Sequence, residues 1–255
     1  MIQAIDHVVI LVTDLAEAIH DYEALGFRVV PGGEHTDGAT HNALISFADG
    51  TYLELLAFRR EAQGHRWWPH VAAGEGLIDF ALLPQAIAVD VAAAKARGLH
   101  LVGPFEGGRM RHDGVQITWQ TAYGRAAELP FLCGDVTPRA LRVPDGLAHQ
   151  HPNGAVGIFR ITVAVRDLEV SAARYAALIG RSPLIEPGRR LFKLGPGYVV
   201  VQSTEPELVE SATVLDHLEF RGQGPAALAF RRDRLAAIPR VLNPGLSHGV
   251  RMIIA

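Results

Sequence analysis

Residues 5–27 read IDHVVILVTDLAEAIHDYEALGF, an apolar run followed by a segment of different periodicity. The run IDHVVILV is rich in Val and Ile, which is typical of a β-strand. In the segment after it, apolar residues recur at helical spacing, at Leu15, Ile19, Tyr22 and Leu25. Asp14 is placed to cap the start of this helix and Gly26 to end it. The stretch therefore predicts a strand followed by a helix.

Three more strands are predicted in the next thirty residues. The segments RVVPGG, HNALISF and YLELLAF carry β-branched and aromatic residues between Gly and Asp punctuation. The first unit of the chain is therefore βαβββ.

The unit recurs downstream. Residues 77–103 align with it without a gap, which places Gly98 on Gly26 and Asp79 on His7. Their strand and Ala-rich helix are followed by VQITWQTA and AAELPFLC as later strands.

Two further copies follow in the second half of the chain. At residues 158–180, IFRITVAVRDLEVSAARYAALIG repeats the opening stretch, with Asp167 on Asp14. A fourth, weaker copy runs from AALAFRRDRLAAIPRVL into SHGVRMIIA and lacks a counterpart of AAELPFLC. The second pair of copies is therefore expected to be incomplete.

The repeats predict the fold, because one helix on a short sheet cannot bury its apolar face without a second copy. We expect an α+β fold in which tandem βαβββ modules pair into two lobes with cupped mixed β-sheets. The N-terminal lobe takes residues 1–135, a linker rich in Pro and Gly takes 136–156, and a degenerate C-terminal lobe takes 157–255.

Composition excludes several classes of function. The 24 Lys and Arg are balanced by 27 Asp and Glu spread along the chain, which argues against a nucleic-acid partner. No apolar run is long enough to span a membrane, and acidic residues near the N-terminus argue against a secretory signal. Cys133 is the single cysteine and has no partner for a disulfide or a thiolate zinc site. A cytoplasmic protein is expected.

His7 and Glu54 are the polar residues of interest on two predicted strands. Strand alternation places each on a face with apolar neighbours. Imidazole is the commonest protein metal ligand, and a carboxylate among apolar residues needs a cation or a donor. From the residues alone, a core histidine bound to a carbonyl and a glutamate facing solvent remain the alternatives.

The opening strand together with HTDGATHNALISF, DGTYLELLAF, GEGL, HDGVQITW, LPFL and HPNGA resembles the glyoxalase-like domain family of the vicinal oxygen chelate superfamily. The resemblance implies a cup made by paired units. It also implies a divalent metal on the first and fourth strands and a substrate that presents two oxygens to it. His7 matches the first-strand ligand of the family. One departure is CysGlyAsp at Cys133 to Asp135, where an acid and a Trp usually follow LPFL.

The resemblance and the repeat together suggest a complete ligand set. Asp79 replaces His7 in the second copy, and Glu128 aligns with Glu54 to within a residue or two. The expected metal site is His7, Glu54, Asp79 and Glu128, and its largely oxygen donors suit Mn, Mg, Fe, Ni or Zn. The alternatives are an Asp79 that caps a turn and a Glu128 that faces solvent.

Other side chains are expected around the cup. The predicted substrate-binding residues are Asn42, Tyr52, Trp67, Trp68, Trp119 and Phe131. A general base or an alternative ligand is sought among His35, Thr40, His41 and His112. His151 in HPNGA is expected to shape the crossing between the lobes and is kept only as a reserve ligand. An anionic substrate could meet Arg59, Arg60, Arg109 or Arg111, although solvated surface arginines are the alternative.

Three functions remain open. The first is a metal-dependent lyase, isomerase or epimerase in which Glu54 or Glu128 moves a proton, because an apolar surrounding raises a carboxyl pKa. The second is a protein of the bleomycin-resistance type that binds a small molecule without turnover. A ring-cleaving oxygenase is disfavoured, because Arg160 and Val200 replace the ligands in the second lobe. The third function is a dimerising scaffold without a working pocket, and a homodimer is expected as a possible assembly.

Overall fold

A computed structural model describes residues 1–205, 211–233 and 238–255. Its first half consists of two βαβββ units, as predicted. The first unit is β1 (Ala4–Leu11), α1 (Leu15–Ala24), β2 (Val30–His35), β3 (Thr40–Ser46) and β4 (Tyr52–Phe58). The second is β5 (Gly76–Leu83), α2 (Ile87–Ala96), β6 (Val102–Met110), β7 (Gln116–Tyr123) and β8 (Phe131–Asp135), with the 3-10 helix η1 (Trp68–Ala73) before it.

Local sequence fixes the ends of helix α1. The Asp14 carboxylate accepts hydrogen bonds from the backbone N–H groups of Ala16 and Glu17 at 2.8 and 3.1 Å. Gly26 follows the helix with a φ of 86°, a left-handed conformation that glycine adopts without steric cost. The predicted cap and stop are both confirmed, and the chain turns back toward β2.

The two units close into an eight-stranded barrel in the order β1-β4-β3-β2-β6-β7-β8-β5. Strand β1 pairs in parallel with β4 and antiparallel with β5, while β2 meets β6 at the opposite seam. Residues opposite one another on paired strands share a face, so Val9, Glu54 on β4 and Asp79 on β5 all point to the same side.

The linker is partly helical, with α3 (Arg139–Arg142) and η2 (Gly146–His149). A seven-stranded sheet follows it, in the order β10-β11-β12-β9-β13-β15-β14. Its elements are β9 (Ala155–Ala164), α4 (Leu168–Ile179), β10 (Leu184–Glu186), β11 (Arg189–Leu194), β12 (Gly197–Gln202), α5 (Ser211–Phe220), β13 (Gly224–Arg232), β14 (Arg240–Val241) and β15 (Arg251–Ile254). The sheet stays open, as expected for an incomplete second lobe. Part of the fourth copy, residues 234–237, lies outside the described residues.

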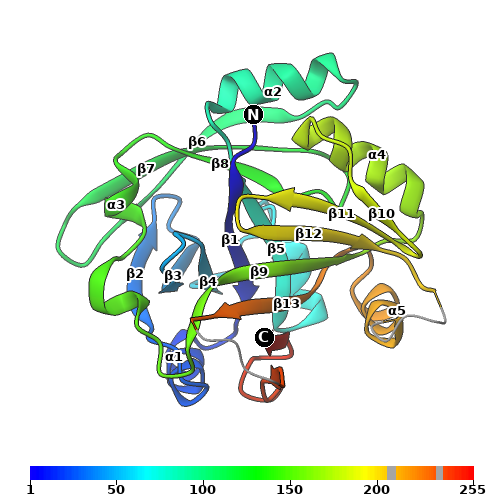
Figure 1. Ribbon diagram of the computed structural model, residues 1–255. Coiled ribbons are helices and arrows are strands. Elements are labelled where there is room, and N and C mark those ends of the chain that lie inside the picture. Colours follow the sequence, from blue (N-terminus) through cyan, green and yellow to red (C-terminus); the bar gives the residue numbers. More distant parts are fainter. Residues whose placement is uncertain (206–210, 234–237) are drawn as a thin grey trace.

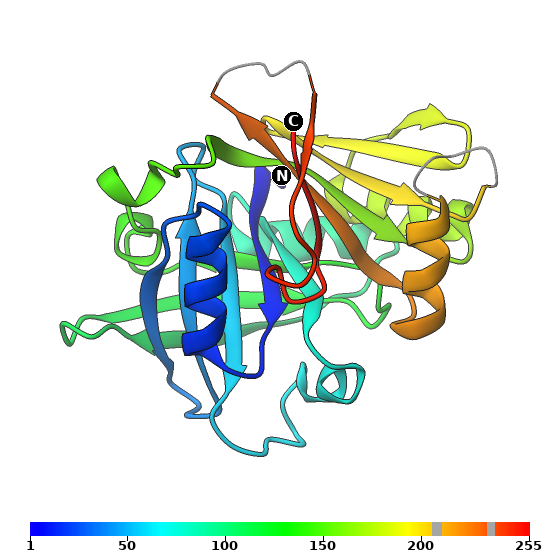
Figure 2. The same ribbon diagram turned by 90° about the horizontal axis from the view of Figure 1, so that it is seen from below.

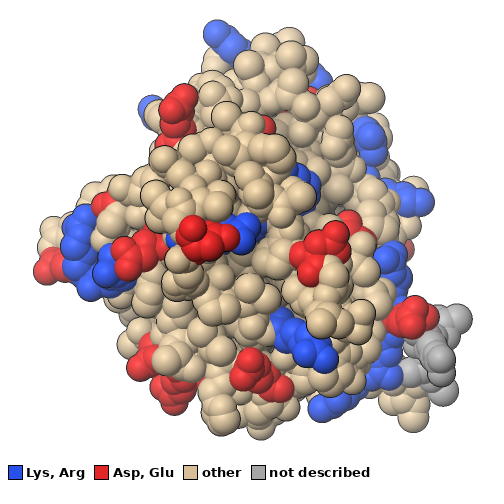
Figure 3. Space-filling view, turned by 90° about the vertical axis from the view of Figure 1, so that its left-hand side faces the viewer, with Lys and Arg blue, Asp and Glu red and all other residues tan. Residues whose placement is uncertain are grey.

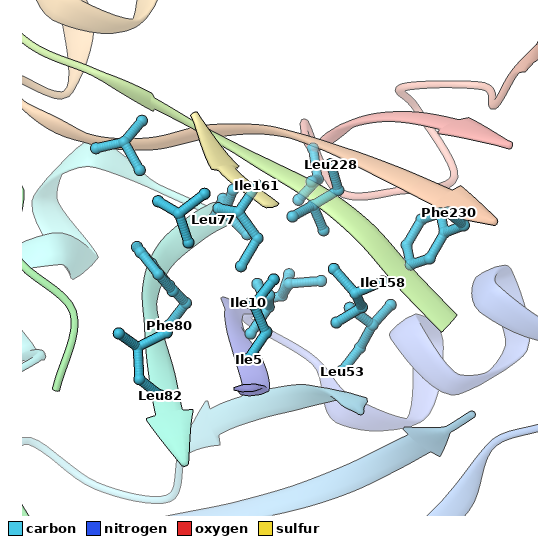
Figure 4. Packing of buried hydrophobic residues seen from close by; sticks show 14 of the residues in the cluster. Ile5, Ile10, Leu53, Leu77, Phe80, Leu82, Ile158, Ile161, Leu228 and Phe230 are labelled. Carbon is cyan, nitrogen blue, oxygen red and sulfur yellow. The ribbon is translucent and has the colours of Figure 1, made fainter. Parts of the chain in front are cut away.

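The barrel and the open sheet share one hydrophobic core. Figure 1 shows β9, β12 and β13 running across β1, and Figure 2 shows the sheet beside the barrel from below. In Figure 4, Ile10 and Leu53 of the barrel point toward Ile158 and Leu228 of the sheet. Because this side of β1 is filled by the second lobe, the opposite side is left for a cavity.

Charge on the surface is mixed. On the face in Figure 3, acidic and basic side chains are interspersed among large areas of other residues. None of the described helices has the length and apolar character that a membrane span requires.

Candidate functional site

A cavity of about 210 Å³ opens inside the barrel. Five of the six predicted substrate-binding residues line it: Asn42, Tyr52, Trp67, Trp119 and Phe131. Polar side chains reach it from both units, so the cavity combines aromatic walls with ionisable groups. Such a combination is typical of a small-molecule site.

Glu54 lies at the centre of the polar side chains in the cavity. It is 5% exposed, and its Oε1 accepts a 2.6 Å hydrogen bond from the Asn42 amide. His7 Nε2 lies 3.5 Å from Oε2, and His35 Nε2 lies 3.4 Å from Oε1. The carboxylate is therefore held between two imidazoles that face different oxygens.

His7 is oriented by its neighbour in the sequence. The register between β1 and β5 shifts between Ile5 and His7, a β-bulge that sets Asp6 beside the imidazole. The Asp6 carboxylate accepts from His7 Nδ1 at 2.7 Å, which leaves Nε2 directed toward Glu54.

Arg142 on α3 completes this arrangement, although the linker was expected only to cross between lobes. Its guanidinium is 2% exposed and donates to Asp6 at 2.8 Å and to the Tyr52 hydroxyl at 2.7 Å. Arg139 donates to the other Asp6 oxygen at 2.5 Å. The sequence signal for these residues was the adjacent Asp6–His7 pair, but strand alternation alone would have placed Asp6 on the opposite face.

Electrostatics at the site correct one expectation. Burial alone would raise the pKa of Glu54, but the hydrogen bond with His7 and the charges of His35 and His7 lower it to about 2. Glu54 is therefore ionised at neutral pH and is a poor proton carrier, contrary to the prediction from its apolar strand. Burial lowers the pKa of His35, which favours a neutral imidazole.

Asp79 lies on the inner side of β5 but does not meet His7. Its Oδ2 accepts from Arg66 at 2.7 Å and from the Trp67 indole N–H at 2.8 Å, and its Oδ1 accepts from the Phe80 N–H. The carboxylate is therefore satisfied by three donors. The expected approach of Asp79 to His7 is replaced by a pairing that fixes Arg66 and Trp67 at the cavity wall.

Glu128 is not brought to the cavity. In the barrel, Val9 lies opposite Glu54, whereas its equivalent Ala81 lies opposite Phe131, so Phe131 takes the place of Glu54 in the second unit. Glu128 precedes β8 and pairs instead with Arg174 of α4 at 2.6 Å. Its expected roles as ligand and proton carrier therefore have no support in its position.

The remaining candidates divide between site and scaffold. His35, Thr40 and Arg109 line the cavity. Trp68 packs outside it against Phe58, with ring centroids 4.9 Å apart. His151 accepts from the Arg28 N–H and bonds to the Ser46 carbonyl, which makes it structural. The cavity lining does not include His41, His112, Arg59, Arg60 or Arg111.

One cluster within the described chain has three metal-binding groups within 4.8 Å of one another, Asp6, His7 and Cys133. It does not fit a cation well, because Arg139 and Arg142 already neutralise Asp6 and would repel added positive charge. Burial raises the pKa of the Cys133 thiol to about 12, so it offers no thiolate at neutral pH.

His7 and Glu54 fit a divalent cation better. Metal-binding imidazoles usually hold their second nitrogen on a carboxylate, as Asp6 does for His7. The 3.5 Å between His7 Nε2 and Glu54 Oε2 is compatible with two ligands, each about 2.1 Å from one ion. His35 stands on the other oxygen of Glu54, farther from that position.

The sequence profile of the glyoxalase-like domain family matches residues 5–179, which cover the barrel, the linker and the start of the open sheet. The chain belongs to this family. The glyoxalase-like domain places it in the vicinal oxygen chelate superfamily, as the sequence resemblance implied. No curated protein sequence matches the chain.

Solved structures share the fold of this glyoxalase-like protein. A hypothetical protein from Staphylococcus aureus matches with a TM-score of 0.77 and 13% identity over 98% of each chain. A mutant 4-hydroxymandelate synthase from Streptomyces coelicolor has a TM-score of 0.61 and 16% identity, over 92% of this chain and 72% of that chain. At these identities the likeness shows the shared fold alone.

Proposed function

We propose that this glyoxalase-like protein is a divalent-metal-dependent enzyme of the lyase, isomerase or epimerase type. It would act on a small substrate with two neighbouring oxygens. The observation that carries the proposal is a buried, ionised Glu54 that faces Nε2 of His7, an imidazole that Asp6 orients. The imidazole donor favours Mn, Fe, Ni or Zn over Mg.

A cation bound by His7 and Glu54 would polarise substrate oxygens and stabilise charge that develops on them. Asp6 fixes the ring of His7, and Asn42 fixes the Glu54 carboxylate by its 2.6 Å hydrogen bond. His35 is the best proton acceptor, because burial keeps its imidazole neutral and Thr40 engages its Nδ1 at 2.7 Å. The aromatic walls would exclude water from the reacting atoms.

Equilibrium dialysis against Mn²⁺ or Zn²⁺ tests the proposal. We expect wild-type protein to bind about one equivalent, and His7→Ala or Glu54→Gln to lose most of the affinity. His41→Gln is a matched control, because His41 lies on β3 beside Asn42 but outside the cavity lining. Wild-type protein that binds no metal, or His7→Ala protein that binds it normally, would contradict the proposal.

A second candidate function is ligand binding without turnover. It is favoured by the hydrogen bonds and charges that already satisfy Glu54 without a cation, and by the aromatic walls. Binding of a small molecule with neither bound metal nor product would select this alternative.

A further inference from the structure

Arg109, near the end of β6, is a buried cation without a direct ion pair to any of the described acidic residues. It is 3% exposed and lines the cavity. Its Nη2 donates to the Arg142 carbonyl at 2.7 Å and its Nη1 to the Asn42 amide oxygen at 3.4 Å. Its Nε has no hydrogen-bond partner, and none of the described acidic residues forms an ion pair with it.

The other two arginines of the cavity are neutralised within the protein. Arg66 pairs with Asp79 at 2.7 Å, and Arg142 pairs with Asp6 at 2.8 Å. Removing a charge from water is costly unless an opposite charge accompanies it. Burial accordingly lowers the pKa of Arg109 below its ordinary value. An anionic ligand would supply the missing charge.

The position of Arg109 selects the kind of anion. The Asn42 side chain lies between Arg109 and Glu54, with its oxygen toward the guanidinium and its nitrogen 2.6 Å from Glu54 Oε1. One amide group thus separates the Arg109 guanidinium from Glu54, which is proposed to hold the metal. A guanidinium suits a carboxylate because its N–H groups match the two oxygens.

Two glycines of β6, Gly107 and Gly108, precede Arg109 and line the cavity. A Cβ at Gly107 would come within 2.6 Å of the Trp119 indole nitrogen, so a larger residue there would collide with the cavity wall. Glycine at this position therefore lets β6 and Trp119 pack closely at the wall that carries Arg109.

We propose that Arg109 binds the carboxylate of a small acid that occupies the cavity beside Glu54 and His7. This assignment rests on the proposed function in one respect, that both use the same cavity. It adds that the ligand carries a carboxylate.

The test compares an acid with its neutral amide. Binding of 3-phenyllactate and 3-phenyllactamide is followed by calorimetry on wild-type protein, Arg109→Gln and Arg111→Gln, each with and without a chelator. Arg111 is a matched control two residues along the chain, and it pairs with Asp113 outside the cavity. We expect wild-type and Arg111→Gln protein to bind the acid about tenfold or more tightly than the amide.

Arg109→Gln should abolish this preference by weakening the acid and sparing the amide. Arg109→Lys, which retains the charge, should keep part of the preference and serves if Arg109→Gln does not fold. Equal binding of acid and amide by wild-type protein, no binding of either, or an unchanged preference in Arg109→Gln would overturn the assignment.

The chelator separates this inference from the proposed function. An acid preference that depends on Arg109 in a protein that binds no metal would support the carboxylate site and contradict the metal-dependent enzyme. A protein that binds metal but does not prefer the acid would support the metal-dependent enzyme and contradict the carboxylate site.

Discussion

Asp6 has no exposed surface, yet its carboxylate is ionised because Arg142, Arg139 and His7 surround it. Burial alone would raise its pKa, but these partners hold the pKa well below the usual range. Removing one partner from a buried pair leaves an uncompensated charge, which is more costly than losing an exposed pair. The orientation of His7 therefore depends on a residue of the linker.

We predict that Arg142→Met lowers the free energy of unfolding by about 3 kcal/mol, since Asp6 keeps only Arg139 and His7 as partners. Urea denaturation measures the loss. Combined with Asp6→Asn, the same substitution should cost less than the sum of the single changes, because the buried charge is gone.

Arg59→Met provides the control for this cycle. Arg59 pairs with Glu34 at the surface, where its side chain is 41% exposed, so its loss should change stability by about 0.5 kcal/mol or less. An Arg142→Met protein as stable as wild type would show that the buried network does not hold Asp6.

Sequence reasoning at this scale succeeded where a side chain follows strand periodicity. Alternation placed Glu54 and Tyr52 on one face, and both line the cavity. Asp6 does not follow strand alternation, because a β-bulge moves it to the face of His7. The role of Arg142 could not be predicted, because more than a hundred residues of chain separate it from Asp6 and no local sequence pattern indicates such a contact.

At the scale of elements, the helices that carry caps and stops were predictable. Asp167 caps α4 through the Val170 N–H at 3.0 Å, as Asp14 caps α1. The register of the strands was harder to predict from the sequence, because the repeat aligns residues only to within a few positions. Glu128 therefore aligned with Glu54 in sequence, while Phe131 occupies the equivalent place on β8. Helix α5, between the third and fourth copies, has no counterpart in the opening unit.

Helix α5 carries a histidine whose pKa shift predicts a pH-dependent stability. Burial, together with the charge of Arg221, lowers the pKa of His217 from 6.5 to about 4. Between these pH values the unfolded chain binds a proton that the folded chain does not. The free energy of unfolding should therefore be highest above pH 6.5 and fall as the pH drops toward 4.

Urea unfolding at several pH values checks this effect. His217→Gln should flatten the dependence between pH 6.5 and 4, whereas a matched change at the exposed His20 of α1 should leave the wild-type slope. The assignment fails if both variants follow the wild-type curve.

At the scale of the whole molecule, the second lobe supports the first. The parallel register that sets Glu54 opposite Val9 sets Val200 opposite Thr162 in the open sheet. The ligand position is thus apolar in the C-terminal half, and its sheet packs on the barrel instead (Figure 4). The incomplete second lobe was predictable from the missing repeat, but its packing across β1 was not, because the repeats specify each lobe separately.

Glu128 belongs to this contact between the lobes. It is 1% exposed and accepts from Arg174 at 2.6 Å and from Ser171 at 3.3 Å. We predict that Glu128→Gln lowers the free energy of unfolding by about 1–2 kcal/mol, less than a fully buried pair would lose, because Arg174 is partly exposed. Metal and ligand binding should be unchanged, as titration calorimetry on the folded variant would check. Loss of metal binding without loss of stability would instead indicate that Glu128 takes part in the metal site.

The position of a bound cation tests the central claim most directly. We predict that an anomalous-difference map of crystals soaked in Mn²⁺ shows a peak within about 2.3 Å of His7 Nε2 and the Glu54 carboxylate, and none in His7→Ala crystals. A peak at Asp79 or Glu128, or a fully soaked crystal with no peak in the barrel, would contradict the account.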